Sequence, residues 1–174
     1  MCGIVGYIGH RDAYPIIIKG LKRLEYRGYD SAGIMLFNDT NIVVKTKGKV
    51  SDLEQIAASH DNKGKTLGMG HTRWATHGIP SDLNSHPHLS NSGKIAIVHN
   101  GIIENYAALK KMLSDNGFHF KSDTDTEVLV NLIEFIKTSQ KLKVGKAVQI
   151  ALTQVVGAYA IAVIDADRPG EVVV

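Results

Sequence analysis

The sequence contains a single cysteine, at position 2, directly after the initiator methionine. Removal of Met1, which the small Cys2 side chain permits, would leave a thiol and a free α-amine on one residue. Such an amine has an ordinary pKa of about 7.7–8.0, against about 10.4 for lysine. Roughly a third of these amines are neutral near pH 7.5, so the amine can serve as general base for its own thiol. This pattern predicts a nucleophile. The alternatives are a small residue in a buried strand, or a retained Met1 that blocks the amine.

Three polar segments downstream carry groups that such a nucleophile needs. Residues 71–78 read His-Thr-Arg-Trp-Ala-Thr-His-Gly, in which arginine offers a planar pair of donors for a carboxylate, with hydroxyl and imidazole groups nearby. Residues 98–101 read Val-His-Asn-Gly, where a side-chain amide and the next backbone N–H can point at one oxyanion. Residues 26–33 read Tyr-Arg-Gly-Tyr-Asp-Ser-Ala-Gly. Each segment also has a plainer interpretation as a turn or a strand end.

Together with the initial Met-Cys-Gly-Ile-Val-Gly, these segments resemble the class II glutamine amidotransferase domain, a family of N-terminal-nucleophile hydrolases. The resemblance runs from Cys2 to Val174 in the same order and departs at no motif position. The motifs are most similar to the hexosamine-forming branch, in which C-terminal sugar-isomerase domains follow. The resemblance implies one type 2 amidotransferase domain over residues 1–174, with an α+β fold that forms a four-layer α/β/β/α sandwich of antiparallel sheets.

The resemblance also implies roles for the residues at the reacting bond. Cys2 would attack the side-chain amide of glutamine, with its own α-amine as the base. The side chain of Asn100 and the backbone N–H of Gly101 would form the oxyanion hole. Arg27 resembles a structural residue close to the nucleophile.

On the substrate side, the resemblance implies that Arg73 holds the α-carboxylate of glutamine with help from Thr76 and His77. Trp74 resembles the residue that gates the route of released ammonia, and Asp125 resembles the acid that binds the substrate α-ammonium group. The sequence allows a plainer role for Asp125. The threonine before it and the glutamate two residues later have capping-box spacing, which places Asp125 in the first turn of a helix, where acids are favoured.

The activity that these roles imply is hydrolysis of L-glutamine to glutamate and ammonia through a Cys2 thioester. In the full-length enzyme, sugar-isomerase domains of the same chain would use the ammonia to convert fructose 6-phosphate to glucosamine 6-phosphate. No cofactor is implied, and a homo-oligomer is expected only at full length. Two alternatives remain open: another N-terminal-nucleophile amidotransferase or amidohydrolase, and a non-catalytic regulatory module of the same fold.

The composition excludes several other classes of protein. A formal net charge of +3 without a run of five like charges argues against a nucleic-acid or membrane partner. One cysteine cannot form an internal disulfide, which favours a reducing, cytoplasmic location. No apolar stretch approaches the roughly 18 residues of a transmembrane helix.

Eight histidines raise the question of a metal site. The sequence has no His-Glu-x-x-His motif and no second cysteine, so we expect no metal. The histidines are expected to line or brace the active-site loop instead.

Hydrophobic periodicity predicts the elements that must position these groups. Strands are predicted at 3–9, 32–37, 41–46, 67–73, 94–100, 158–165 and 171–174, and helices at 17–24, from Ser51, and at 106–113, 128–136 and 144–155. A loop over 75–92 is long enough to be functional. Strands, helices and strands follow one another without regular βαβ alternation, which favours an α+β fold of antiparallel sheets. Because the chain stops inside an apolar run of three valines, we expect a domain truncated at its C-terminal end.

Overall fold

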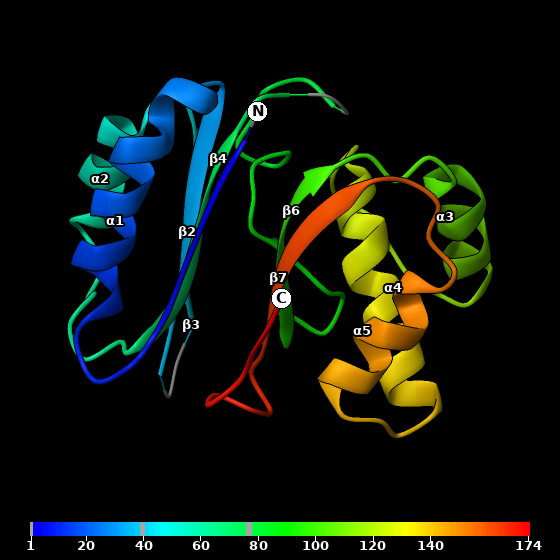
Figure 1. The fold of residues 1–174 in the computed structure, drawn as a ribbon. Coiled ribbons are helices and arrows are strands. Elements are labelled where there is room, and N and C mark those ends of the chain that lie inside the picture. Colours follow the sequence, from blue (N-terminus) through cyan, green and yellow to red (C-terminus); the bar gives the residue numbers. More distant parts are fainter. Residues whose placement is uncertain (1, 39–40, 76–77) are drawn as a thin grey trace.

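The structure, a computed structural model, describes residues 2–38, 41–75 and 78–174. It has four layers: two antiparallel sheets lie face to face, and helices cover the outer face of each (Figure 1). This is the predicted α/β/β/α sandwich. Among the described residues, no helix combines the length and apolarity that crossing a bilayer requires.

The first sheet has the strand order β1-β4-β2-β3, with every pair antiparallel. Its strands are β1 (Gly3–Ile8), β2 (Ser31–Phe37), β3 (Asn41–Lys47) and β4 (Leu67–Arg73), and its covering helices are α1 (Ala13–Leu24) and α2 (Val50–Ala57). The hairpin of β2 and β3 is confirmed, although residues 39–40 of its predicted turn lie outside the described residues.

The second sheet has the order β5-β6-β7-β8, also antiparallel throughout. Its strands are β5 (His88–Leu89), β6 (Ile95–Gly101), β7 (Tyr159–Asp165) and β8 (Val172–Val173), and its covering helices are α3 (Tyr106–Asp115), α4 (Asp125–Ser139) and α5 (Val144–Leu152). The short strand β5 lies inside the predicted loop over 75–92, which therefore has structure of its own.

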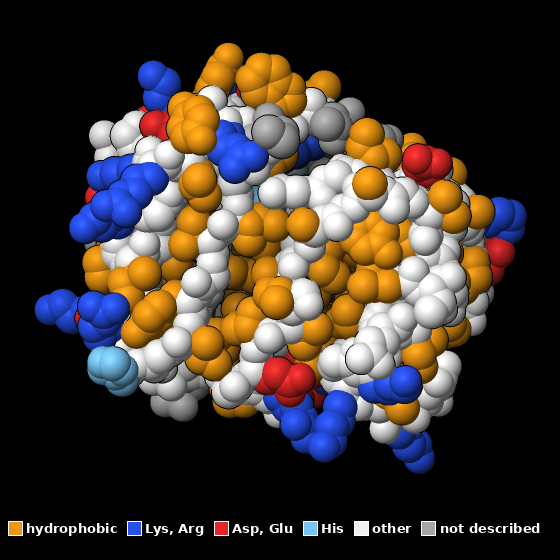
Figure 2. Space-filling model, in the orientation of Figure 1, with side chains coloured by type: hydrophobic (Ala, Val, Ile, Leu, Met, Phe, Trp, Pro, Cys, Tyr) orange, Lys and Arg blue, Asp and Glu red, His pale blue; other side chains and the backbone are white. Residues whose placement is uncertain are grey.

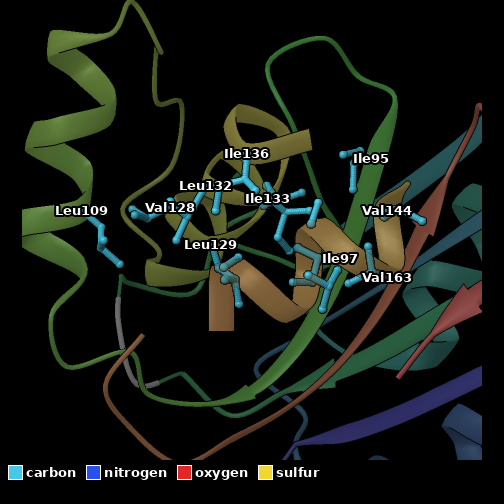
Figure 3. Packing of buried hydrophobic residues seen from close by; sticks show 14 of the residues in the cluster. Ile95, Ile97, Leu109, Val128, Leu129, Leu132, Ile133, Ile136, Val144 and Val163 are labelled. Atoms are coloured by element: carbon cyan, nitrogen blue, oxygen red, sulfur yellow. The ribbon is translucent and has the colours of Figure 1, made fainter. Parts of the chain in front are cut away.

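The central strands β2 and β6 are apolar on both faces, and this is why four layers form. In β6, Ile95 and Ile97 pack with α4 and α5 (Figure 3), whereas Ala96 and Val98 pack against the other sheet. Successive side chains of a strand point to opposite faces, so a strand without a polar face must be covered twice. In β2, Ala32, Ile34 and Leu36 belong to the core under α1, whereas Met35 and Phe37 belong to the core between the sheets. β4 adds Leu67 and Met69 to the core between the sheets, and a third core lies under α4.

The start of α2 differs from the prediction. The spacing of Ser51 and Glu54 predicted a capping box, but the helix begins at Val50. The carboxylate of Asp52 accepts the N–H of Lys49 at 2.8 Å, and Val50 donates its N–H to Glu25 at 2.6 Å. The Ser51 prediction is therefore wrong, because acids outside its motif take the free N–H groups at the start of the helix.

The segment before β5 is packed tightly between the layers. A Cβ atom on Gly33 of β2 would overlap the backbone carbonyl oxygen of His86. Only glycine fits where two backbones approach this closely. The close approach holds His86 and its neighbours at the inner face of the first sheet.

Candidate active site

Strand alternation brings the predicted nucleophile and the predicted cation into the same layer. Gly3 of β1 pairs with Thr72 of β4, so Cys2 lies beside the end of β4. Leu67 and Met69 of β4 pack between the sheets, which places Arg73, four residues after Met69, on that same inner side. The start of β1 and the end of β4 therefore present their side chains toward the second sheet.

A cavity of about 520 Å³ opens at this end of the molecule. Six of the predicted site residues line it: Cys2, Arg73, Trp74, Asn100, Gly101 and Asp125. Its size is typical of a small-molecule site. Thr76 and His77, which the sequence also predicted at the site, lie outside the described residues. Arg27, predicted to lie close to the nucleophile, lines the cavity as well.

Cys2 is held by backbone contacts at the cavity wall. The N–H of Trp74 donates to Cys2 Sγ at 3.1 Å, and Asn100 Nδ2 donates to the Cys2 carbonyl oxygen at 3.2 Å. The cysteine is half-buried and lines the cavity, so the alternative of a fully buried core residue is wrong. The predicted removal of Met1 concerns a residue outside the described part of the chain.

The segment that follows α1 braces the end of β4. The carboxylate of Asp30 accepts the N–H of Ala75 at 2.8 Å, and the Asp30 N–H donates to the carbonyl of Arg73 at 3.1 Å. A Cβ on Gly28 would lie 2.9 Å from the Arg73 carbonyl carbon, so this turn depends on a glycine. The polar character of residues 26–33 therefore serves to hold the arginine segment in place.

Arg73 is a nearly buried cation that faces the cavity. Its side chain is 3% exposed, and Nη2 donates to the carbonyl of Gly78 at 3.1 Å. Burial lowers the pKa of the guanidinium, while Cys2, Asp125 and Asp30 act in the opposite direction. An arginine starts so far above neutral pH that it remains charged. A buried fixed positive charge at a cavity wall suits an anionic group of a ligand.

Asp125 occupies the first turn of α4 and also lines the cavity. Thr124 caps the helix by accepting the Glu127 N–H at 3.3 Å, as the spacing predicted. The return bond of a capping box is replaced, because Glu127 accepts the N–H of Ser122 at 2.7 Å instead. One carboxylate oxygen of Asp125 accepts the N–H of Ile103 at 2.8 Å. Asp125 therefore lies both in the first turn of a helix, as its plainer interpretation predicted, and at the cavity.

Asn100 and Gly101 end β6 directly opposite Cys2. The Oδ1 atom of Asn100 lies 2.8 Å from His71 Nε2, and its Nδ2 donates to the Cys2 carbonyl. Gly101 has a φ of +127°, and a Cβ there would overlap the carbonyl oxygen of Ala158. Glycine is therefore required at the position predicted to supply a backbone N–H.

Four histidines lie buried around and behind the cavity. Thr126 Oγ1 is 2.9 Å from His86 Nε2 and 2.8 Å from His99 Nδ1. The rings of His71 and His86 stack with centroids 4.3 Å apart, and His88 Nε2 lies 3.0 Å from the hydroxyl of Thr124. His86 and His99 line the cavity. Within the described ranges, no group of three or more His, Cys, Asp or Glu side chains is arranged to hold a metal ion.

These histidines predict a loss of stability in mild acid. Burial lowers the pKa of His71 to about 4, and burial also lowers the pKa of His86 and His88. The unfolded chain protonates these groups near pH 6.5, so below that pH it binds more protons than the folded chain. The free energy of unfolding should fall between about pH 6.5 and pH 4, with His71 alone contributing about 3 kcal/mol.

Urea denaturation at pH 7, 6 and 5 measures this loss. The midpoint should fall at each step in the wild-type chain. His60 is exposed and serves as the control. The urea midpoint of His60→Gln should fall with pH by the same amount as that of the wild-type chain. A midpoint that does not change between pH 7 and pH 5 would contradict the neutral state of the buried cluster.

Sequence reasoning did not place five further residues at the cavity: Ile102, Thr124, Thr126, Ala158 and Tyr159. Tyr159 begins β7 and Ala158 directly precedes it, more than fifty positions after Asn100. Both reach the site because Gly101 pairs with Tyr159. One local signal exists. Gly157 has a φ of +141°, and a Cβ there would overlap the Ile102 carbonyl, so the glycine before the predicted strand marks this close approach.

Comparison with solved structures defines the class of protein. Glutamine phosphoribosylpyrophosphate amidotransferase from B. subtilis superposes with a TM-score of 0.80 at 29% identity, covering 95% of this chain and 35% of that one. A structure titled the allosteric regulatory enzyme of purine biosynthesis gives 0.82 at 31% identity, with 95% and 36% covered. With a cysteine at the head of its first strand, the fold is that of an N-terminal-nucleophile amidotransferase domain.

The sequence comparisons define the family. Residues 57–174 match the family described as glutamine amidotransferase domain. The glutamine–fructose-6-phosphate aminotransferase [isomerizing] of Bacteroides thetaiotaomicron is 60% identical over 99% of this chain, and that of Chlorobaculum tepidum is 54% identical over 100%. The chain belongs to the glutamine amidotransferase domain family. It spans 28% and 29% of the length of these two relatives.

Proposed function

We propose that this chain is a glutaminase domain that hydrolyses L-glutamine to glutamate and ammonia. The observation that carries the proposal is one cavity lined by a thiol, a buried cation and a carboxylate: Cys2, Arg73 and Asp125. Free glutamine has an α-carboxylate, an α-ammonium group and a side-chain amide. The three side chains offer a partner for each of these groups, with the nucleophile reserved for the amide.

The proposed reaction passes through a thioester on Cys2. Once Met1 is removed, the α-amine takes the thiol proton, and Sγ attacks the amide carbon of the substrate. The tetrahedral oxyanion accepts hydrogen bonds from Asn100 Nδ2 and the Gly101 N–H. Its collapse breaks the C–N bond, and the α-ammonium returns the proton to the departing ammonia. A water molecule then attacks the thioester, which releases glutamate and restores the thiol.

Arg73 is proposed to bind the α-carboxylate, with Thr76 and His77 contributing from the part of the chain outside the described residues. Asp125 is proposed to bind the α-ammonium group with the carboxylate oxygen that Ile103 does not occupy. Trp74 is 48% exposed at the cavity and packs edge-on against Tyr29 at 5.7 Å between centroids. A large, partly exposed ring at that position suits the proposed role of gating the exit of ammonia.

The ammonia is proposed to serve a longer enzyme of which this chain is one domain. The curated relatives are named glutamine–fructose-6-phosphate aminotransferase, and the chain spans about 28% of them. We therefore propose that C-terminal sugar-isomerase domains of the same full-length chain use the ammonia to convert fructose 6-phosphate to glucosamine 6-phosphate. A cytoplasmic location and a homo-oligomer at full length belong to this proposal. Figure 2 shows hydrophobic side chains both at the upper end of this face and across its middle. Separately, the exposed apolar residues of the chain include Tyr26, Trp74 and Ile79.

Two assays on the chain test the proposed function. Ammonia release should be much faster from glutamine than from asparagine or simple primary amides. A diazo-ketone analogue of glutamine should inactivate the chain and label Cys2, as located by mass spectrometry. Labelling at any other residue would contradict the mechanism, and equal rates on all amides would favour a general amidohydrolase instead.

A further inference from the structure

We propose that His71 is a positioning residue for the oxyanion hole: it selects the orientation of the Asn100 amide. The proposal rests on the proposed glutaminase function. His71 lies on β4 of the first sheet and Asn100 at the end of β6 of the second, so their hydrogen bond joins the two sheets beside the nucleophile.

The chemical need arises because an asparagine amide has two ends of similar shape and opposite polarity. Only the Nδ2 end can donate to an oxyanion, and a flip of about 180° would present Oδ1 to the developing negative charge. Asn100 Nδ2 donates to the Cys2 carbonyl at 3.2 Å. An amide nitrogen carries two N–H groups, so this bond anchors one and leaves the other for the substrate.

His71 supplies the second half of the selection. Its Nε2 lies 2.8 Å from Asn100 Oδ1, and because Oδ1 can only accept, Nε2 must carry the proton. A flipped amide would place Nδ2 against this N–H, so that two donors would face each other. It would also place Oδ1 against the Cys2 carbonyl, so that two acceptors would face each other. Both contacts therefore favour the same orientation.

The surroundings of His71 keep its donor fixed. The side chain is 1% exposed and stacks on His86. His86, His99 and the Arg73 cation face it, and burial holds its pKa near 4. At neutral pH the ring is therefore a neutral imidazole with its proton on Nε2, and the donor toward Asn100 is present throughout the reaction.

A competing interpretation is that His71 only fills space between the sheets. His71→Leu and His71→Gln separate the two interpretations, because leucine fills the space without a donor whereas the glutamine amide nitrogen lies the same number of bonds from Cα as His71 Nε2. We expect His71→Leu to lower kcat about 10- to 100-fold with little change in KM for glutamine. We expect His71→Gln to recover most of the loss.

The Asn100→Ala background gives the decisive measurement. If His71 acts through Asn100, then adding His71→Leu to Asn100→Ala should lower kcat no further. His88→Leu is the matched control, because His88 is an equally buried histidine bonded to Thr124 rather than Asn100. It should keep a kcat close to wild type. Alkylation of Cys2 by iodoacetamide, which forms no oxyanion, should proceed at the same rate in wild type and His71→Leu.

The outcomes are distinguishable. A wild-type chain that releases no ammonia from glutamine removes the proposed function and this inference with it. An active wild type in which His71→Leu keeps its kcat overturns only the inference. The inference also fails if His71→Leu costs the same factor in kcat with and without the Asn100 side chain, since that would be the signature of a purely structural effect.

Discussion

Cys2→Ala is expected to abolish ammonia release from glutamine while the chain remains folded. The thiol is the only nucleophile among the described residues that the proposed mechanism uses, and its removal leaves no route to the thioester. The fold should tolerate the change because Cys2 lies half-buried at a cavity wall and belongs to none of the three hydrophobic clusters. We expect a change in the free energy of unfolding of at most about 0.5 kcal/mol.

A coupled assay for glutamate and a thermal melt of the same sample check this result. Cys2→Ser is the useful companion, because it keeps the size and the hydrogen-bonding position of the group while replacing the stronger nucleophile. It should retain at most a small fraction of wild-type kcat. Full activity in a folded Cys2→Ala variant would eliminate the thioester mechanism.

Arg73→Lys is expected to raise KM for glutamine about 10- to 100-fold and to change kcat much less. Lysine keeps the charge, but its ammonium is a point donor that cannot match a carboxylate with two parallel hydrogen bonds. The loss should be large because Arg73 is almost fully buried, so the substrate carboxylate would be desolvated against an imperfect partner. The effect should therefore appear in binding rather than in the chemical step.

Steady-state kinetics over a wide range of glutamine concentration measure the split between KM and kcat. Arg168→Lys is the matched control, because that arginine is exposed and pairs with Glu171 at 3.7 Å, far from any proposed site role. It should leave both constants unchanged. A wild-type KM in Arg73→Lys would remove Arg73 from the carboxylate site.

The local pattern of apolar residues was sufficient to predict most of the strands and helices and their layering. The apolar character of β2 and β6 on both faces requires cover on both sides, and the observed layers provide it. The start of α2 could not be predicted in the same way. Its free N–H groups are taken by Glu25, which is distant in sequence, and by Asp52, so the Ser-x-x-Glu spacing was not decisive.

In the candidate site too, some residues could be predicted from local sequence and others could not. Residues within recognisable motifs, such as Cys2 and Arg73, could be proposed from the sequence and lie at one cavity. Tyr159 could not, because it reaches the cavity only through the pairing of β6 with β7. The hydrogen-bond partners of the buried histidines also could not be predicted from the sequence. The hydroxyl groups of Thr124 and Thr126 come from the start of α4, and no spacing rule links that helix to β4 or β6.

The active-site cavity draws its walls from two separate cores. The thiol and the guanidinium belong to the sheet covered by α1 and α2, whereas the amide and the carboxylate belong to the half covered by α3, α4 and α5. Neither half contains a working set of groups. The rate of glutamine hydrolysis should therefore depend on the packing of the two halves against each other. A partly folded chain with one intact half would show no activity while keeping much of its secondary structure.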